Sequence, residues 1–299
     1  MTATLTTEVT AAADRIRPHV RRTPLLHAEV DGRPLALKLE HLQRTGSFKL
    51  RGALNALLAG DLPAEVVTAS GGNHGIGVAT AARILGLRAT VFVPDSVPEG
   101  KARRIERAGA RLVRAGSTYF DAAAAAREAA TGPGIRYVEA YNDPVVIAGQ
   151  GTVAAEIVAD APEVDAIAVA VGGGGLAAGV ALGGAGRLTV AVEPERCACL
   201  HHALAAGEPV DAEVVSVASS ALGATRAGAV PFGILSSHPV RSLLVTEDAI
   251  LAARDRLWEE FRLAVEPAAA VPFAAWLDGQ VPGERPCVVI CGANADWTP

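Results

Sequence analysis

Lys49 is the residue whose type and position in this sequence most clearly suit covalent chemistry. The 299-residue chain has 27 basic residues, but only three are lysines, at positions 38, 49 and 101. Lys49 follows the Gly46-Ser47-Phe48 turn and opens a helix that we predict to run to about Ala59. The helix dipole and the neighbouring Arg51 both lower the pKa of an ammonium group, which leaves more free amine to attack a carbonyl. Lys49 is therefore our candidate for a Schiff-base lysine. A solvated lysine in a first helical turn is the alternative.

The other two lysines have structural explanations. Lys38 lies in the alternating stretch 35–40, which is typical of a strand with one charge facing solvent. Lys101 lies among arginines and glutamates on a predicted polar helix. We assign no chemistry to either of them.

Two glycine-rich turns stand out, at residues 70–75 (Ser-Gly-Gly-Asn-His-Gly) and 172–175 (four glycines). Each turn follows a predicted strand and opens a predicted helix. Such turns lie at the carboxyl ends of parallel strands, where bare backbone N–H groups and a helix N-terminus face an anion. We expect one turn to hold a phosphate and the other a carboxylate. A tight turn without a ligand is the alternative for each.

The second turn also matches a dinucleotide fingerprint. Gly173 and Gly175 are followed by Ala178 on the next helix, and Glu193 ends the next strand, 20 residues after Gly173. This alternative predicts an oxidoreductase, but it leaves Lys49 and the 70–75 turn unexplained.

Around these residues, predicted strands and helices alternate regularly. Strands are expected at residues 35–40, 66–69, 88–93, 111–113, 135–138, 166–171, 188–192, 241–245 and 286–290. Helices are expected at residues 1–20, 49–59, 73–85, 98–108, 117–130, 144–159, 176–182, 247–261 and 267–277, and residues 216–230 are irregular. Repeated units of this kind predict the α/β class with parallel sheets. A loop at 139–144 breaks the rhythm and returns the chain to a second domain.

Composition and charge exclude several partners. The net charge is −5 and no basic block lacks interleaved acids, so we expect no nucleic acid partner. Residues 166–186 carry no charge, but eight of them are glycine, so a strand, a loop and a helix explain the run better than a membrane span. We expect no membrane partner and no signal peptide.

The four cysteines are expected to be reduced thiols of a cytoplasmic protein, because nothing marks the chain for export. Cys197 and Cys199, with His201 and His202, suggest a zinc site as an alternative. No partner at ligand spacing completes a tetrahedral set, and we predict no metal.

Six motifs together carry a resemblance to a known family. They are GSFKLRG at 46–52, SGGNHG at 70–75, AGQGT at 148–152, GGGGL at 172–176, EP at 266–267 and CGAN at 291–294. In this order they resemble the pyridoxal-phosphate-dependent serine/threonine dehydratase and serine racemase family, over nearly the whole chain. The resemblance implies the two-domain α/β fold of tryptophan synthase β-subunits. Residues 1–45 and 141–299 would form the large, phosphate-binding domain, and residues 46–140 the small domain with the carboxylate turn.

The resemblance also implies a role for individual residues. Lys49 would form the Schiff base with pyridoxal 5'-phosphate and later remove the Cα proton. The cofactor would be held by Phe48, Asn73, Gly172, Gly173, Gly174, Gly175, Leu176 and Cys291, with Asn73 on the phenolic oxygen and Cys291 facing the pyridine nitrogen. The substrate carboxylate is expected at Ser70, Gly71, Gly72, Asn73 and His74. A thiol does not keep the pyridine nitrogen protonated, which favours loss of a β-hydroxyl over transamination.

Three positions depart from the family pattern. Racemases of the family have a serine at the position of Gly71, so racemisation is disfavoured here. The family's cation site matches Glu193 but meets Cys199, a poor ligand for Mg²⁺ or Ca²⁺. The family's His-Pro pair is replaced by Glu139-Ala140, followed by Tyr141, beside the substrate side chain.

The sequence thus predicts a cytoplasmic lyase that dehydrates and deaminates a β-hydroxy amino acid. We expect L-threonine to give 2-oxobutanoate and ammonia, and L-serine to give pyruvate more weakly. The alternatives are a racemase, a lyase for an unusual β-substituted amino acid, a dinucleotide-binding oxidoreductase and a cofactor carrier without turnover. We also expect a homodimer, with no regulatory domain after Cys291.

Overall fold

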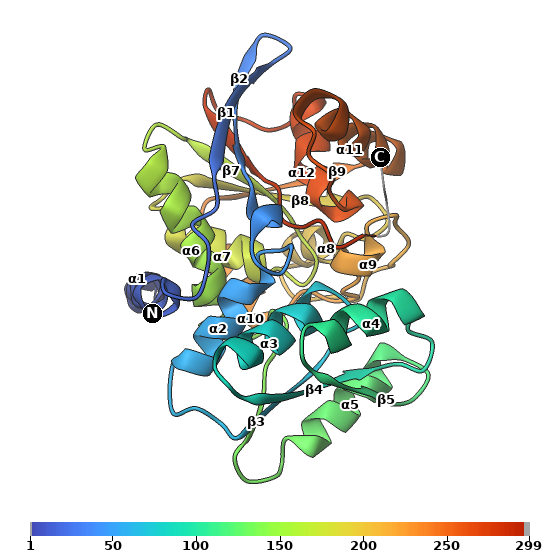
Figure 1. The fold of residues 1–299 in the computed structure, drawn as a ribbon. Coiled ribbons are helices and arrows are strands. Elements are labelled where there is room, and N and C mark those ends of the chain that lie inside the picture. The colour runs from blue at the N-terminus through green and yellow to red at the C-terminus, as the bar shows by residue number, and fades with distance from the viewer. Residues whose placement is uncertain (1, 296–299) are drawn as a thin grey trace.

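The computed structural model describes residues 2–295 and contains two β-sheets with helices on both sides (Figure 1). The predicted α/β class with parallel sheets is confirmed. None of the helices within residues 2–295 combines the length and the apolar character that a membrane crossing requires.

The larger sheet has six strands in the order β1-β2-β10-β7-β8-β9. Their bounds are β1 Leu25–Val30, β2 Arg33–Lys38, β7 Ala166–Ala170, β8 Leu188–Pro194, β9 Val240–Val245 and β10 Pro286–Val289. All neighbours are parallel except β1 and β2. The central strand β7 is buried at every position, as expected for a strand covered on both faces. The carboxyl end of β7 leads directly into the 172–175 turn.

Helices cover both faces of this sheet (Figure 1). Helix α7 (Gly175–Gly183) packs on one face, backed by α6 (Pro144–Asp160), and helices α11 (Glu247–Phe261) and α12 (Pro267–Leu277) cover the other. Local capping explains several starts: Asp143 accepts from the Val145 amide before α6, and Thr246 accepts from the Ala249 amide before α11. Helix α8 (Cys199–Ala206) follows β8.

The smaller sheet has four parallel strands in the order β5-β4-β3-β6. They are β3 Glu65–Ala69, β4 Arg88–Val93, β5 Arg111–Arg114 and β6 Ile135–Tyr137. Helices α3 (Asn73–Ile84) and α4 (Glu99–Arg107) cover one face, and α5 (Tyr119–Ala129) covers the other (Figure 1). A capping box between Thr118 and Asp121 starts α5.

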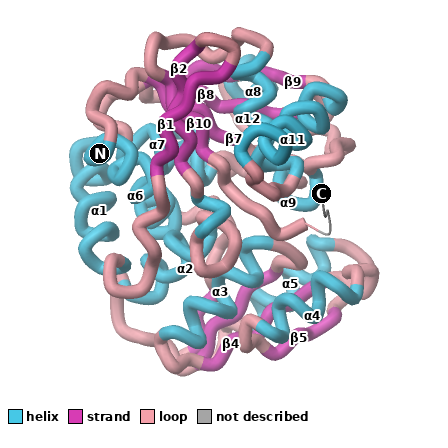
Figure 2. Tube along the Cα trace, turned by 45° about the horizontal axis from the view of Figure 1, so that its top comes forward, coloured by secondary structure: helices cyan, strands magenta, loops and turns pink. Residues whose placement is uncertain are grey.

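Helix α2 (Lys49–Leu58) joins the two halves of the molecule, as the tube in Figure 2 shows. It packs against α6 on one side and α3 on the other, and α1 (Thr2–Ile16) packs against α6. The N-terminus of α2 therefore lies between the two sheets.

Some elements were absent from the sequence-based predictions. Strand β1 pairs with β2 through a tight turn with positive φ at Asp31 and Gly32. It was not predicted because buried and exposed residues do not alternate regularly along it. The residue before helix α8 provides no side-chain cap. The Glu193 carboxylate takes this role and accepts from the Leu200 and His201 amides. The stretch 216–230 contains α9 (Ser219–Leu222) and the start of α10 (Ala229–Leu235).

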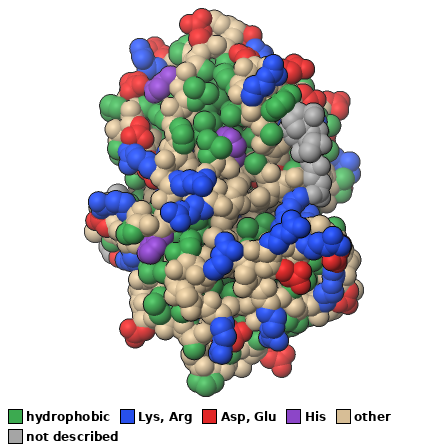
Figure 3. Space-filling model, viewed as in Figure 1, with side chains coloured by type: hydrophobic (Ala, Val, Ile, Leu, Met, Phe, Trp, Pro, Cys, Tyr) green, Lys and Arg blue, Asp and Glu red, His purple; other side chains and the backbone are tan. Residues whose placement is uncertain are grey.

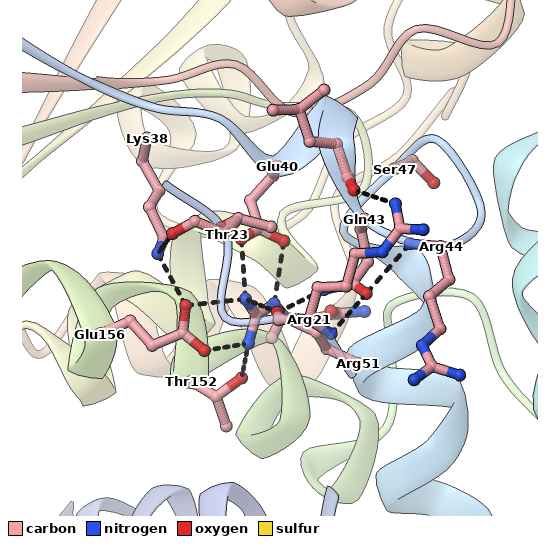
Figure 4. A network of polar contacts seen from close by, with 12 residues as sticks. Arg21, Thr23, Lys38, Glu40, Gln43, Arg44, Ser47, Arg51, Thr152 and Glu156 are labelled. Atoms are coloured by element: carbon pink, nitrogen blue, oxygen red, sulfur yellow. Dashed lines mark hydrogen bonds and ion pairs between the residues drawn. The ribbon is translucent and has the colours of Figure 1, made fainter. Parts of the chain in front are cut away.

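The prediction that Lys38 faces solvent was wrong. Lys38 is completely buried, and its Nζ donates to the Thr23 carbonyl at 2.7 Å and to Glu156 Oε2 at 2.6 Å. The Lys38 side chain is buried because it lies on the face of the sheet that α6 covers, where Glu156 contacts it. Glu156 also binds Arg51, and Arg51 binds Glu40, which gives a buried cluster of two cations and two carboxylates (Figure 4).

This cluster predicts a large loss of stability when Glu156 is removed. Glu156→Ala leaves the buried Lys38 and Arg51 with one carboxylate, so we expect it to lower the free energy of unfolding by about 3–5 kcal/mol. Urea unfolding followed by circular dichroism measures this. Glu213→Ala, which breaks an exposed pair with Arg196, is the control and should change stability little. Equal small losses in both variants would contradict the prediction.

Candidate active site

A cavity of ≈ 560 Å³ lies where the carboxyl ends of the two parallel sheets face each other. All the site residues predicted from the sequence line this cavity: Phe48, Lys49, Ser70, Gly71, Gly72, Asn73, His74, Gly172, Gly173, Gly174, Gly175, Leu176 and Cys291. The fold therefore brings together segments that are up to about 240 residues apart in the sequence. Their individual roles stay predictions.

Lys49 is the first residue of α2 and is partly buried. Its Nζ donates to the Ala140 carbonyl at 2.8 Å and lies 5.3 Å from the centre of the Phe48 ring. Burial lowers the pKa of the Lys49 amine to about 8, against a smaller opposing effect of Cys291. Two causes of this shift were predicted from the sequence, the helix dipole and the charge of Arg51, and Arg51 is not among its causes. Arg51 points away into the buried cluster, where Glu40 and Glu156 neutralise it.

The 70–75 turn connects β3 to α3. Ser70 Oγ accepts from the Gly72 amide at 3.2 Å, and Asn73 opens the helix. The His74 ring cannot bind an anion through Nε2, because Nε2 bonds to the Val138 carbonyl at 3.1 Å. Burial, with a smaller effect of Lys49, lowers the pKa of His74 to about 3, so the ring is neutral and Nε2 carries the proton. His74 can thus offer an anion its backbone N–H only.

The 172–175 turn connects β7 to α7. Gly174 has φ +93°, which favours glycine, and a Cβ at Gly173 would lie 2.3 Å from the Tyr141 ring. A Cβ at Gly175 would lie 2.8 Å from Tyr141 Cβ. The close packing of Tyr141 therefore requires glycine here, and the N-terminus of α7 is left with bare amides.

Cys291 follows β10 and is 4% exposed. Its carbonyl accepts from the Phe48 amide at 3.2 Å, which places the thiol beside the start of α2. Burial, followed by the Glu266 carboxylate, raises the pKa of the Cys291 thiol well above its ordinary value. The thiol therefore stays protonated and uncharged at neutral pH.

Glu193 does not support the dinucleotide alternative. Its carboxylate is completely buried and accepts from the amides of Leu200 at 2.9 Å and His201 at 2.7 Å, so it faces α8 and not a ribose. Burial raises the pKa of Glu193 to about 7.

Cys199 Sγ donates to the Gly172 carbonyl at 3.3 Å. All four cysteines are free and buried, and residues 2–295 contain no group of three His, Cys, Asp or Glu that could hold a metal.

Several residues of the cavity wall were missed from the sequence. They include Lys101, Tyr119, Phe120, Glu266 and the segment 219–225. Only 4% of the chain is aromatic, so the two adjacent aromatic residues in the first turn of α5 could have marked that turn as part of the site. The Glu-Pro pair at the start of α12 could have marked Glu266 in the same way. The segment 219–225 offers no such signal.

Basic side chains lie near the cavity on one face of the molecule. In Figure 3, lysine and arginine side chains form a broken band where the two halves of the molecule meet, with a dense group over α4. Helix α4 carries Lys101, Arg103, Arg104 and Arg107. Such a band attracts small anions.

The match to a family model identifies the cofactor of this protein. The model of pyridoxal-phosphate dependent enzymes matches residues 16–292. The chain belongs to this family of pyridoxal-phosphate dependent enzymes.

Named relatives agree with this family. The L-threonine ammonia-lyase of Geobacter sulfurreducens is 39% identical over 97% of this chain and 75% of its own length. The enzyme of the same name from Thermotoga maritima is 34% identical over 97% of this chain and 75% of its own. Among solved structures, the T.th. threonine deaminase has a TM-score of 0.92 at 36% identity, covering 98% of this chain and 99% of that one. Maize serine racemase has a TM-score of 0.92 at 28% identity, covering 97% and 93%.

The cavity fits pyridoxal phosphate chemically. Its aldehyde needs a free amine, and Lys49 has a lowered pKa. Its phosphate needs bare amides at a helix N-terminus, and the crowding of Gly173 and Gly175 by Tyr141 shows why no side chain covers them. Its pyridine nitrogen can face Cys291, which stays neutral.

The pKa of Lys49 predicts how fast the cofactor attaches at each pH. When apoprotein is mixed with pyridoxal phosphate, we expect the rate at which the visible absorbance appears to rise with pH to a midpoint at about 8, since the free amine is the nucleophile. Stopped-flow absorbance measures the rate. Free lysine treated in parallel corrects for titration of the cofactor itself. A midpoint near 10.5, the ordinary value, would contradict the prediction.

Proposed function

We propose that this enzyme eliminates water from L-threonine and that hydrolysis of the resulting enamine then gives 2-oxobutanoate and ammonia, with L-serine as a weaker substrate. The supporting observation is that an amine of lowered pKa, two glycine-rich turns and a neutral thiol meet in one cavity. The names of the relatives support threonine as the amino acid.

In this proposal, separate segments bind separate parts of the cofactor and substrate. Lys49 would hold the cofactor's aldehyde carbon through its amine, and Phe48 would pack beside the ring. Amides of the 172–175 turn and of Leu176 would hold the phosphate, Asn73 would hold the phenolic oxygen and Cys291 would lie beside the pyridine nitrogen. The substrate carboxylate binds at Ser70, Gly71, Gly72, Asn73 and His74.

The chemistry divides between these groups. Pyridoxal phosphate, when bound, supplies an electron sink for negative charge at Cα. The Lys49 amine takes the Cα proton, and its low pKa makes it an effective base near neutral pH. The Cys291 thiol cannot keep the pyridine nitrogen protonated, which limits the sink and favours expulsion of the β-hydroxyl.

We also propose the domain division, assembly and location predicted from the sequence. Residues 46–140 form the small domain, and residues 1–45 and 141–299 the large one. Every strand of the four-stranded sheet lies within 46–140, which supports this division. The homodimer rests on the family resemblance, and four unpaired thiols support a cytoplasmic location.

Three aromatic residues favour a second candidate, a lyase for a larger β-substituted amino acid. Tyr119, Phe120 and Tyr141 line the cavity, and the Phe120 side chain is 67% exposed. Such side chains offer apolar contact area to a substituent larger than methyl. Comparing rates for L-threonine, L-serine and β-phenylserine in one assay decides between the candidates.

The first test of the proposed function is direct assay of 2-oxobutanoate from L-threonine. We expect product from the cofactor-loaded enzyme. Lys49→Ala should abolish both the visible absorbance and all turnover, because no other amine attaches the cofactor. Lys101→Ala, the other lysine of the cavity wall, is the control and should keep the visible absorbance. A Lys49→Ala variant that retained either property would refute the assignment, and a spectral shift without product would point to another substrate.

Gly71 should decide between elimination and racemisation. Glycine offers no proton on the cavity face opposite Lys49, so we expect Gly71→Ser to add measurable racemase activity. A Cβ at this position would lie 3.0 Å from Val97 Cγ2, so the double variant Gly71→Ser/Val97→Ala relieves the contact. Chiral chromatography after incubation with L-serine detects the D-isomer. Absence of D-serine from both folded, cofactor-loaded variants would contradict the account of Gly71.

A further inference from the structure

A chain of hydrogen bonds at the cavity wall links Glu266, Asn73 and Asn294. Asn73 Nδ2 donates to Glu266 Oε1 at 2.7 Å. Asn294 Nδ2 donates to Asn73 Oδ1 at 2.8 Å and to the Thr45 carbonyl at 2.7 Å. The chain thereby connects the start of α3 with the start of α12 and the segment after β10. The proposed function gives no role to Glu266 or Asn294.

Chemistry fixes the direction of each hydrogen bond in this chain. A backbone carbonyl can only accept, so Asn294 turns its NH₂ group toward Thr45. The same NH₂ group donates to Asn73, which must present its carbonyl oxygen to Asn294 and its own NH₂ group to Glu266. A flipped Asn73 amide would place two donors against each other. The orientation of Asn73 is therefore determined from both sides.

Two glycines make room for this chain. A Cβ at Gly292 would lie 2.3 Å from Glu266 Oε1 and 3.3 Å from Asn73 Nδ2. Gly46 has φ +72°, and a Cβ there would lie 2.7 Å from Asn294 Oδ1. Any side chain at either position would displace a member of the chain, so the backbone is shaped around these contacts.

Glutamate side chains are rarely fully buried in proteins, so the burial of Glu266 indicates a functional role. It is 3% exposed, and burial raises the pKa of its carboxyl group to about 7, although Asn73, the Asn294 amide, Lys101 and Arg104 oppose the shift. Burying a carboxyl group at this cost in stability is typical of functional sites.

We propose that Glu266 is a positioning residue for the cofactor. Together with Asn294 it fixes the amide of Asn73, occupies one N–H of that amide and leaves the second N–H for the phenolic oxygen of pyridoxal phosphate. This inference rests on the role proposed for Asn73, and it does not depend on which amino acid is the substrate.

The test compares Glu266→Ala, Asn73→Ala and the double variant without substrate. The readouts are the dissociation constant of pyridoxal phosphate and the position of its visible band. We expect each single variant to weaken binding about tenfold and to shift the band, as for loss of one hydrogen bond. The double variant should bind no more weakly than Asn73→Ala, because Glu266 acts through Asn73. Additive losses, or wild-type binding and band in Glu266→Ala, would overturn the proposal.

Further variants keep the test decisive. Glu266→Gln retains an acceptor for Asn73 and should keep binding within about twofold of wild type, whereas a purely electrostatic role would make it as weak as Glu266→Ala. Asn294→Ala removes the other end of the chain and should reproduce the tenfold loss. If Glu266→Ala does not fold, wild-type binding by Asn294→Ala overturns the proposal. Glu259→Ala, at an exposed position of α11, is the matched control. A wrong substrate assignment would leave all these results unchanged.

Discussion

The position of α2 depends on the buried guanidinium of Arg51. Arg51 lies two residues after Lys49 and is completely buried, with Nε and Nη2 on Glu40 at 2.8 Å and Nη1 on Glu156 at 2.8 Å. Burial alone would raise the pKa of Glu40, but the charge and hydrogen bonds of Arg51 lower it. Because the carboxylates come from separate segments, the cluster fixes the axial and rotational position of the helix that carries Lys49 (Figure 4).

Close backbone packing reinforces this arrangement. A Cβ at Gly149 would lie 2.7 Å from the Arg51 carbonyl and from Gly52 Cα, and a Cβ at Gly52 would lie 2.3 Å from the Gln150 side chain. Thr152 accepts from Arg51 Nη1 at 3.1 Å. The motifs at 46–52 and 148–152 are thus the two sides of one contact between α2 and α6.

The cavity that results is poor in charge. Burial keeps His74 and Cys291 neutral and lowers the pKa of Lys49. In such surroundings the amides at the start of α7 and the basic residues of α4 are the main attraction for an anionic cofactor. Burial between the carboxyl ends of the two sheets therefore lowers the pKa of the Lys49 amine and keeps the neighbouring groups neutral.

The sequence by itself determined the alternation of strands and helices and the glycine-rich turns. These features depend on local periodicity and on conformations that glycine tolerates, so they can be predicted without a fold. Helices α11 and α12 run over the predicted residues, since their starts are marked by Thr246 and by Pro267.

Only the tertiary structure decided how charges are paired and which residues share the cavity. Lys38 was predicted to face solvent because its strand alternates, but α6 covers this face of the sheet and buries Lys38 against Glu156. The start of α8 was missed because its cap comes from Glu193 across a loop. The contact between Asn73 and Glu266, 193 residues apart, cannot be predicted from the local sequence. It forms only when the carboxyl ends of strands from distant parts of the chain come together.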